Sequence, residues 1–303
     1  MSAKLVALMD PQQLITLLSP LAWTDQAQGI NAADIDVRQP FWQWSVVARA
    51  LAPTLLAGEQ RIVSITGSQG SGKSTFARIL VQQLNELGVQ AAGVSLDDFY
   101  LSKQSRAQLG RDVHPLLATR GVPGTHDWGR LGDVLEQFSR SKGVFNLSLP
   151  QFDKGVDDRV QDIHVAAEVL VFEGWCLGVQ PQPQALLQKP VNELERLEDP
   201  QGSWRQWCNQ QIHQHYQRLW DFVDAWMLLQ PPDFAQVIEW RRQQEMDLAP
   251  AQRMSEPALQ RFIQHYERLT RWQWQQPLGG EGLGFDLTAG HQIAAIRPLG
   301  QPN

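Results

Sequence analysis

One segment, residues 61–75 (RIVSITGSQGSGKST), constrains the fold of this chain more than any other. Its first six residues are mostly β-branched or apolar, which predicts a short buried strand. The next eight match the pattern G-x-x-x-x-G-K-[ST]. Apolar side chains then recur at helical spacing from Phe76 to Leu87. The segment therefore predicts a strand, a glycine-rich loop and a helix in direct succession.

This glycine-rich loop predicts a site for a nucleoside triphosphate such as ATP. Its backbone N–H groups can converge on phosphate oxygens, and the helix N-terminus adds partial positive charge. We expect Lys73 to reach the β- and γ-phosphates and the Ser74 hydroxyl to bind Mg²⁺. The predicted nucleotide-binding residues of the loop are Gly67, Ser68, Gln69, Gly70, Ser71, Gly72, Lys73, Ser74 and Thr75. The alternative, a Gly-Ser turn that only ends a strand, is disfavoured because the required strand and helix flank the motif.

The rest of the chain predicts an α/β fold of the P-loop NTPase type. We expect three layers, with a mainly parallel sheet flanked by helices and an N-terminal helical extension. Residues 1–58 are the predicted extension, in which Pro11 opens one helix behind the N-cap Asp10, and residues 59–303 are the predicted catalytic domain. The motifs assign no role to the extension and no residue to the base of the nucleotide.

Composition narrows the class of partner. The 303 residues are 43% hydrophobic and carry a net charge of −6 without a basic block, which argues against nucleic acid as a partner. No apolar run approaches the length needed to span a membrane. Two cysteines, Cys176 and Cys208, lack metal or redox spacing. We expect a cytoplasmic protein with a small-molecule substrate; the sequence carries no signal for an oligomeric state.

Acidic residues follow two further predicted strands. Residues 90–96 end in Asp97 and Asp98, and residues 165–172 end in Glu173. The carboxyl ends of parallel strands face the ligand cleft of an open sheet. A kinase needs one carboxylate there to accept the proton of the attacking hydroxyl and an acid to hold Mg²⁺. The alternative for Asp97 and Asp98 is an N-cap for the following helix.

Two connecting segments carry candidate ligands for an anionic acceptor. Residues 102–126 read as a polar connector with Arg120 and His126, and Asp127 is either a ligand or the N-cap of a helix over 128–140. Residues 149–159, considered alone, read as a solvated loop after a strand over 144–149.

The remaining predicted elements are helices over 204–220, from Asp233 onward and over 256–274, and strands over 224–230 and 292–296. Arg241, on the helix from Asp233, is either a lid residue over the phosphates or a solvated arginine.

The motif order resembles the uridine kinase, pantothenate kinase and phosphoribulokinase group, and within it the plant-type D-glycerate 3-kinases. The segments that carry this resemblance are GSQGSGKST at 67–75, SLDDFY at 95–100, RGVPGTHD at 120–127, LPQFDKGVDDR at 149–159, VLVFEGWCLG at 169–178, WRRQQE at 240–245 and MSEPALQRFIQHY at 254–266. It implies transfer of the ATP γ-phosphoryl group to the 3-hydroxyl of D-glycerate, a step of photorespiratory carbon salvage.

The resemblance also implies roles for individual residues. Asp97 matches the general base, with Lys73 as its catalytic partner on the phosphates, and Glu173 matches the acidic residue that precedes glycine. Arg241 falls in the lid. The residues assigned to the acceptor are Asp98, Tyr100, Arg120, His126, Asp127, Lys154 and Arg159.

Three alternatives stay open from the sequence. The acceptor can be a nucleoside, pantothenate or a sugar phosphate. A nucleotide-dependent binding or regulatory module, or a purely structural helical adaptor, needs no acceptor at all. ADP release that depends on an acceptor separates the kinases from both of these.

Overall fold

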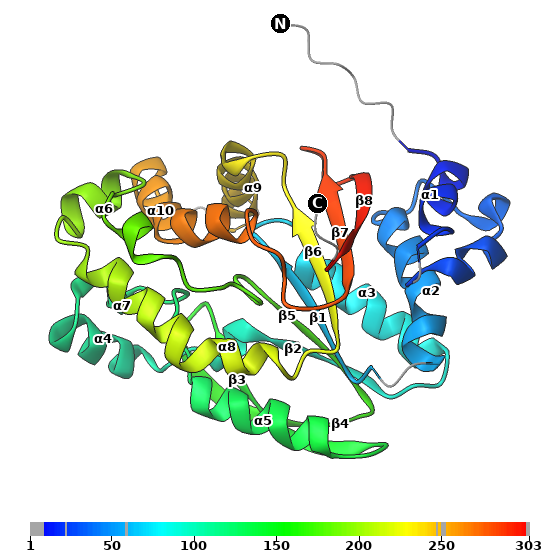
Figure 1. The fold of residues 1–303 in the computed structure, drawn as a ribbon, viewed down its shortest axis with the longest axis horizontal. Coiled ribbons are helices and arrows are strands. Elements are labelled where there is room, and N and C mark those ends of the chain that lie inside the picture. The colour runs from blue at the N-terminus through cyan, green and yellow to red at the C-terminus, as the bar shows by residue number, and fades with distance from the viewer. Residues whose placement is uncertain (1–8, 22, 58–59, 247, 250–252, 301–303) are drawn as a thin grey trace, which may run out of the picture.

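The computed structural model describes residues 9–21, 23–57, 60–246, 248–249 and 253–300 (Figure 1). A six-stranded sheet in the order β2-β5-β1-β6-β7-β8 forms its centre. Its strands are β1 (Ile62–Gly67), β2 (Ala91–Ser95), β5 (Val169–Gly174), β6 (Ala225–Gln230), β7 (Gly282–Leu287) and β8 (Ile293–Leu299). Every neighbouring pair is parallel except β7 and β8. The predicted mainly parallel sheet is confirmed.

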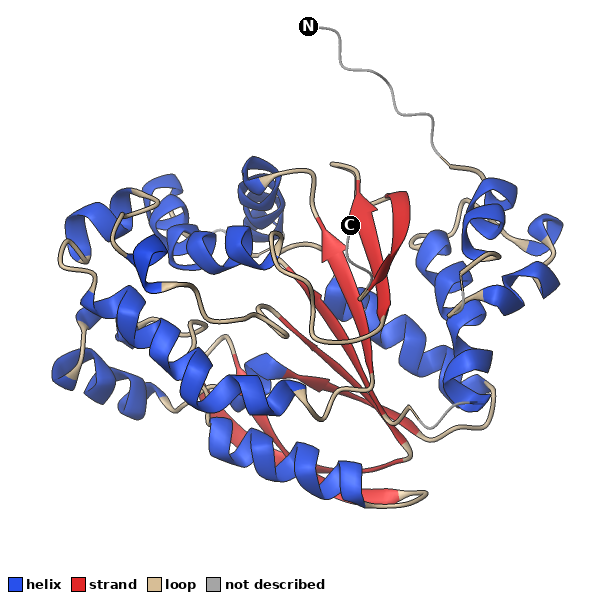
Figure 2. Ribbon diagram, viewed as in Figure 1, coloured by secondary structure: helices blue, strands red, loops and turns tan. Residues whose placement is uncertain are grey.

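Helices cover both faces of this sheet and complete three layers (Figure 2). Side chains alternate along β1, so Val63 and Ile65 join one apolar cluster while Ile62 joins the other. The first cluster includes residues of α1 (Pro11–Leu18), α2 (Trp42–Ala57) and α3 (Lys73–Glu86). The second includes residues of α5 (Trp128–Arg140), α8 (Gln217–Trp220), α9 (Phe234–Met246) and α10 (Glu256–Gln273).

The N-terminal helices lie against the P-loop helix rather than standing apart. Asp10 and Gln13 form a reciprocal capping box at the start of α1, as the predicted N-cap requires. The Trp44 ring of α2 lies 4.6 Å from that of Phe76 in α3 and 5.4 Å from that of Phe285 in β7. The helical extension is therefore present; the boundary at residue 58 remains a prediction.

The prediction of a solvated loop over 149–159 was wrong. Strands β3 (Phe145–Asp153) and β4 (Asp158–Ala167) pair as an antiparallel hairpin that crosses this segment. Leu149 and Phe152 are buried, and the turn at residues 154–157 carries the polar residues. In the sequence, the charged residues around the turn outnumber these two apolar positions, so the pattern did not predict paired strands.

Three other elements differ from the sequence prediction. The connector after Ser102 contains helix α4 (Lys103–Asp112), whose only buried side chain is Arg106 among the residues described, so it shows no apolar period. The run over 204–220 is interrupted: α7 (Ser203–Gln211) and α8 flank a π-helical segment, Ile212–Tyr216. Strand β7 was missed because glycines dilute its pattern; any side chain at Gly282 would collide with the Trp226 carbonyl.

A short helix, α6 (Glu193–Glu198), completes the elements around the sheet. Across the described ranges, no helix is both long and apolar enough to cross a membrane.

Candidate active site

The P-loop connects β1 to α3 in a tight curl. Gly70 and Gly72 have left-handed φ angles of 75° and 90°, which L side chains rarely adopt. A Cβ atom at position 70 would also lie 2.6 Å from the Trp240 Cβ of α9. Among the residues described, Lys73 Nζ donates a single long hydrogen bond, 3.4 Å, to the Ser68 carbonyl. The loop thus has the shape that presents amides and one ammonium group to a phosphate chain.

Sheet order brings two predicted acidic site residues to one edge. Strands β2, β5 and β1 are neighbours, and Glu173 at the end of β5 is in register with Ile65 of β1 and Ser95 of β2. Asp97 follows β2 directly in the 3₁₀ turn Leu96–Phe99. The carboxyl ends of parallel strands therefore place both acids next to the P-loop.

Ser74 and Glu173 form the arrangement expected of a magnesium site. The Ser74 hydroxyl donates to Glu173 Oε1 at 3.0 Å, and Glu173 is only 9% exposed. Its other oxygen, Oε2, is buried and has no partner among the described residues. The described part of the chain contains no group of three or more His, Cys, Asp or Glu side chains that could hold a metal alone. The Ser74 hydroxyl and the Glu173 carboxylate fit a Mg²⁺ ion that takes its other ligands from phosphate and water.

A cavity of about 190 Å³ joins the P-loop to the candidate acceptor residues. The predicted site residues that line it are Gln69, Gly70, Lys73, Ser74, Asp97, Tyr100, Arg120, His126, Lys154, Glu173 and Arg241. Asp98, Asp127 and Arg159 are not among the described residues that line it. The lining also includes residues that were not predicted: Gly121, Trp175, Gln244, Phe262 and Tyr266. Phe262 and Tyr266 were missed because aromatic residues at helical spacing on α10 are typical of a buried core.

Asp97 is the best-placed carboxylate of this cavity. Lys154 Nζ lies 2.7 Å from its Oδ2, and the Tyr100 hydroxyl donates to its Oδ1 at 2.6 Å. Burial raises the pKa of Asp97, but the ammonium groups of Lys154 and Lys73 outweigh burial and lower that pKa to about 2. Asp97 is therefore ionised at neutral pH, and its side chain faces the site instead of capping a helix.

Asp98 points to the hairpin rather than to the cavity. It accepts a hydrogen bond of 3.3 Å from the backbone N–H of Phe152 in β3. Burial raises the pKa of its carboxyl group. The geometry therefore favours Asp97 over Asp98 as the base.

His126 presents a buried hydrogen-bond donor to the cavity. Gly124 N–H donates to the Tyr216 hydroxyl at 2.9 Å, and this hydroxyl lies 2.8 Å from His126 Nδ1. The hydroxyl therefore donates its own proton to Nδ1, which leaves the proton of a neutral ring on Nε2. Burial lowers the pKa of His126 to about 4 and keeps the ring neutral. Nε2 is buried without a partner among the residues described.

Three other predicted acceptor residues are engaged in ion pairs. Arg120 pairs with Asp157, in the turn of the hairpin, and still lines the cavity. Asp127 accepts from the backbone N–H of Arg130, as the predicted N-cap of α5, and lies 3.0 Å from Arg159. Asp127 and Arg159 thus connect α5 to β4 beside the cavity.

Arg241 lies on α9 at the rim of the site. Its guanidinium pairs with Glu245 and lies 5.4 Å from the ring centre of Phe262 on α10. Since Arg241 lines the cavity, it is placed where a lid residue would meet phosphates.

These features define a P-loop phosphotransferase: a phosphate loop, a hydrogen-bonded Ser74–Glu173 pair beside it and an ionised aspartate that faces a small polar cavity. The model of the phosphoribulokinase / uridine kinase family matches residues 62–187. An uncharacterized kinase of Schizosaccharomyces pombe, mug58, is 31% identical over 223 residues, which are 69% of this chain and 79% of that protein.

A plant relative and a solved structure extend the comparison. The chloroplastic D-glycerate 3-kinase of Arabidopsis thaliana is 28% identical over 221 residues, which are 68% of this chain but 46% of the plant protein. The structure of D-glycerate 3-kinase from Cryptococcus neoformans superposes with a TM-score of 0.68 and 25% identity, covering 92% of this chain and all of that one. The chain belongs to the phosphoribulokinase/uridine kinase family and is an ATP-dependent small-molecule kinase.

Proposed function

We propose that this kinase transfers the γ-phosphoryl group of ATP, bound with Mg²⁺, to the 3-hydroxyl of D-glycerate to give 3-phosphoglycerate and ADP. The observation that carries the proposal is the contact between Asp97 and Lys154, 2.7 Å apart, because it places a base beside a cation in the acceptor cavity. Two relatives named D-glycerate 3-kinase support the choice of acceptor. We also propose a cytoplasmic enzyme of photorespiratory carbon salvage, with residues 1–58 as an extension of a catalytic domain over 59–303.

Each end of the reaction has its own residues. The P-loop amides and Lys73 hold the phosphate chain, while Ser74 and Glu173 hold Mg²⁺, which neutralises charge on the transferring phosphate. Asp97 orients the acceptor hydroxyl and accepts its proton. Phosphoryl transfer of this kind depends on alignment more than on base strength, so a carboxylate with a low pKa suffices.

The acceptor end suits a small carboxylate. Lys154 and Arg120 line the cavity as cations, and guanidinium and ammonium groups form charge-assisted bonds with carboxylates. His126 adds a neutral N–H donor from Nε2. A cavity of about 190 Å³ accommodates an acid of glycerate size.

The test is ADP release with Mg-ATP and a panel of acceptors, followed by NMR of the product. We expect D-glycerate to stimulate ADP release and the new phosphate ester to be on the 3-hydroxyl. Glycerol, which lacks the carboxylate, is the matched control, and uridine and pantothenate represent the alternatives. Stimulation by uridine or pantothenate but not by D-glycerate would contradict the proposed acceptor.

Replacing Lys154 by methionine tests the cation of the acceptor cavity. We expect Lys154→Met to raise KM for D-glycerate about tenfold or more, since a charge-assisted hydrogen bond to the carboxylate is lost. Lys142→Met, which removes an exposed lysine beside α5, is the control and should leave KM unchanged. An unchanged KM in both variants would show that Lys154 pairs with Asp97 without meeting the substrate.

Replacing His126 by alanine tests the donor aimed at the acceptor. We expect KM for D-glycerate to rise about tenfold, because a hydrogen bond to a charged group contributes roughly 1.5–3 kcal/mol. Tyr216→Phe keeps the aromatic ring at position 216 but removes the hydroxyl that selects the tautomer of His126. We expect a smaller increase in KM for D-glycerate in this variant. Steady-state kinetics with circular dichroism as a check on folding measures both. If KM stayed unchanged in folded His126→Ala, Nε2 would have no role in binding the acceptor.

A further inference from the structure

The turn of the β3–β4 hairpin, residues 154–157, brings two cations to the acceptor cavity. Lys154, at the start of the turn, lies 2.7 Å from Asp97. Asp157, at its end, pairs with Arg120, and both Lys154 and Arg120 line the cavity. The position of this turn therefore decides where both positive charges meet the carboxylate of an acceptor.

The turn itself is exposed and strained. Val156 is 60% exposed, and Asp157 has a φ of 57°, which residues other than glycine rarely adopt. Within the turn, the Gly155 N–H donates to Asp153 Oδ1 at 2.7 Å. A strained conformation persists when the surrounding structure holds it in place. The turn therefore needs support from outside the hairpin.

Arg106 of α4 supplies this support. Its side chain is 2% exposed, although charged side chains are rarely buried without specific partners. Its Nη2 donates to the Asp157 carbonyl oxygen at 2.7 Å and lies 3.0 Å from Asp157 Oδ1. Arg106 thus holds both the backbone and the side chain of the residue that pairs with Arg120. The Lys103 N–H of the same helix donates to Asp158 Oδ1 at 3.1 Å and ties the end of the turn to α4 a second time.

The other two nitrogens of Arg106 bind the segments that flank the site. Nε donates to the Leu101 carbonyl at 3.1 Å, next to Tyr100, and Nη1 donates to the Ala118 carbonyl at 3.2 Å, two residues before Arg120. A planar guanidinium can serve three carbonyl groups at once, which a lysine cannot do. Arg106 is not among the described residues that line the acceptor cavity, and each of its nitrogens is engaged. Its role is therefore not that of a ligand.

We propose that Arg106 is a positioning residue of the acceptor site, which holds the hairpin turn so that Lys154 and Arg120 face the acceptor. The proposal rests on the proposed function, since it takes D-glycerate as the acceptor. Cations that are held in place before binding reduce the conformational freedom that is lost when the acceptor binds. The affinity for D-glycerate thus depends on a buried arginine that does not touch it.

Steady-state kinetics of Arg106→Met tests this role. Methionine keeps an apolar stem but cannot donate to the three carbonyl groups, and we expect KM for D-glycerate to rise about fivefold. KM for ATP should stay unchanged, because the P-loop is built on β1 and α3. The fall in kcat should be smaller than the rise in KM, since Asp97 follows β2 and not the hairpin. Arg111→Met removes an exposed cation of the same helix and is the matched control, with no change in either KM.

A double variant distinguishes positioning from a general loss of structure. Effects of independent sites multiply, so Arg106→Met and Lys154→Met would together raise KM for D-glycerate about fiftyfold if they acted separately. If Arg106 acts through the turn that carries Lys154, the double variant should stay close to Lys154→Met alone, at about tenfold. Arg106→Lys keeps the charge beside Asp157 with fewer donors, and should restore part of the affinity. Circular dichroism checks that each variant is folded, and Arg106→Lys replaces Arg106→Met in the double variant if the latter does not fold.

Three results would overturn the proposal: an unchanged KM for D-glycerate in the folded Arg106 variants, a KM for ATP that rises as much as that for D-glycerate, or the full multiplied effect in the double variant. An unmodified protein that releases no ADP in response to D-glycerate would instead overturn the proposed function, and the positioning role with it.

Discussion

Replacing Asp97 by asparagine is expected to lower kcat about 10²–10⁴-fold while ATP still binds, the range associated with loss of a positioned general base. The amide keeps the size of the side chain and its contact with the Tyr100 hydroxyl. It removes the negative charge that holds Lys154 Nζ at 2.7 Å from Oδ2. It also removes the oxygen lone pair that takes the proton from the hydroxyl of the acceptor. Steady-state kinetics with ADP detection gives kcat, and calorimetry gives ATP affinity.

The neighbouring carboxylate is the matched control. Asp98→Asn removes a charge at the adjacent position, but Asp98 accepts from the Phe152 backbone, and we expect a much smaller change in kcat. If Asp98→Asn were the severe variant and Asp97→Asn turned over normally, the base would be Asp98. The pH profile adds a second test. Because the pKa of Asp97 is about 2, the carboxylate stays ionised and its protonation should cause no fall in kcat/KM as the pH is lowered from about 7 to 5.

The phosphate end of the site could be predicted from the sequence because its parts are contiguous. A single run of fifteen residues contains the strand, the curled loop and the start of the helix, and local geometry alone aims the amides. Glu173 could be predicted for a related reason. An acid at the end of a buried strand meets the loop wherever that strand neighbours β1, as β5 does.

The acceptor end of the site could not be predicted from the sequence in the same way. The contact of Lys154 with Asp97 depends on a hairpin whose apolar positions are separated by a charged turn. The donor on His126 depends on Tyr216, which is 90 residues further along in a π-helical segment. Nothing local to either residue indicates its partner. Arg159 lies against Asp127, since both side chains meet between β4 and α5, and its role as an acceptor ligand stays a prediction.

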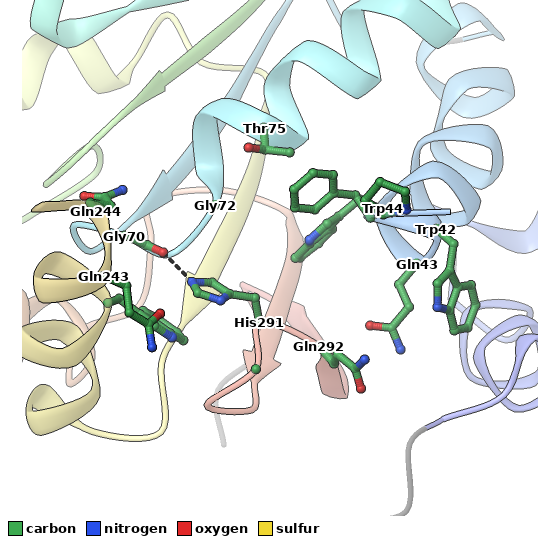
Figure 3. Close-up of a pocket in the computed structure, with 14 residues that line it drawn as sticks. Trp42, Gln43, Trp44, Gly70, Gly72, Thr75, Gln243, Gln244, His291 and Gln292 are labelled. Carbon is green, nitrogen blue, oxygen red and sulfur yellow. Dashed lines mark hydrogen bonds between the residues drawn. The ribbon is translucent and has the colours of Figure 1, made fainter. Parts of the chain in front are cut away.

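A cavity of about 520 Å³ beside the P-loop shows the same limit in a stronger form (Figure 3). Residues near 43, 70, 240 and 291 meet there because β7 and β8 extend the sheet beside β6 and the extension packs on α3. Strand β7 was missed in the sequence, and with it the turn that carries His291.

Replacing Lys73 by methionine is expected to reduce kcat/KM for ATP about 10²–10³-fold, the cost of losing one charged contact to a transferring phosphate. The hydrogen bond of 3.4 Å from the ammonium group to the Ser68 carbonyl is long, so it is easily exchanged for a contact with an incoming phosphate. Methionine retains most of the length and apolar surface, and the loop itself should persist because the Gly70 and Gly72 conformations do not depend on the charge. Steady-state kinetics at varied ATP concentration measures the loss.

A control on the same helix distinguishes a local charge effect from a general one. Arg78→Met removes an exposed cation of α3 that lies beyond the loop, and kcat/KM for ATP should change little. Lys73→Met should also bind inorganic tripolyphosphate more weakly, whereas Arg78→Met should bind it as the unmodified protein does. If Lys73→Met retained both turnover and tripolyphosphate affinity, the phosphates would have to lie elsewhere than on this loop, because the motif lysine contributes charge that no backbone amide can replace.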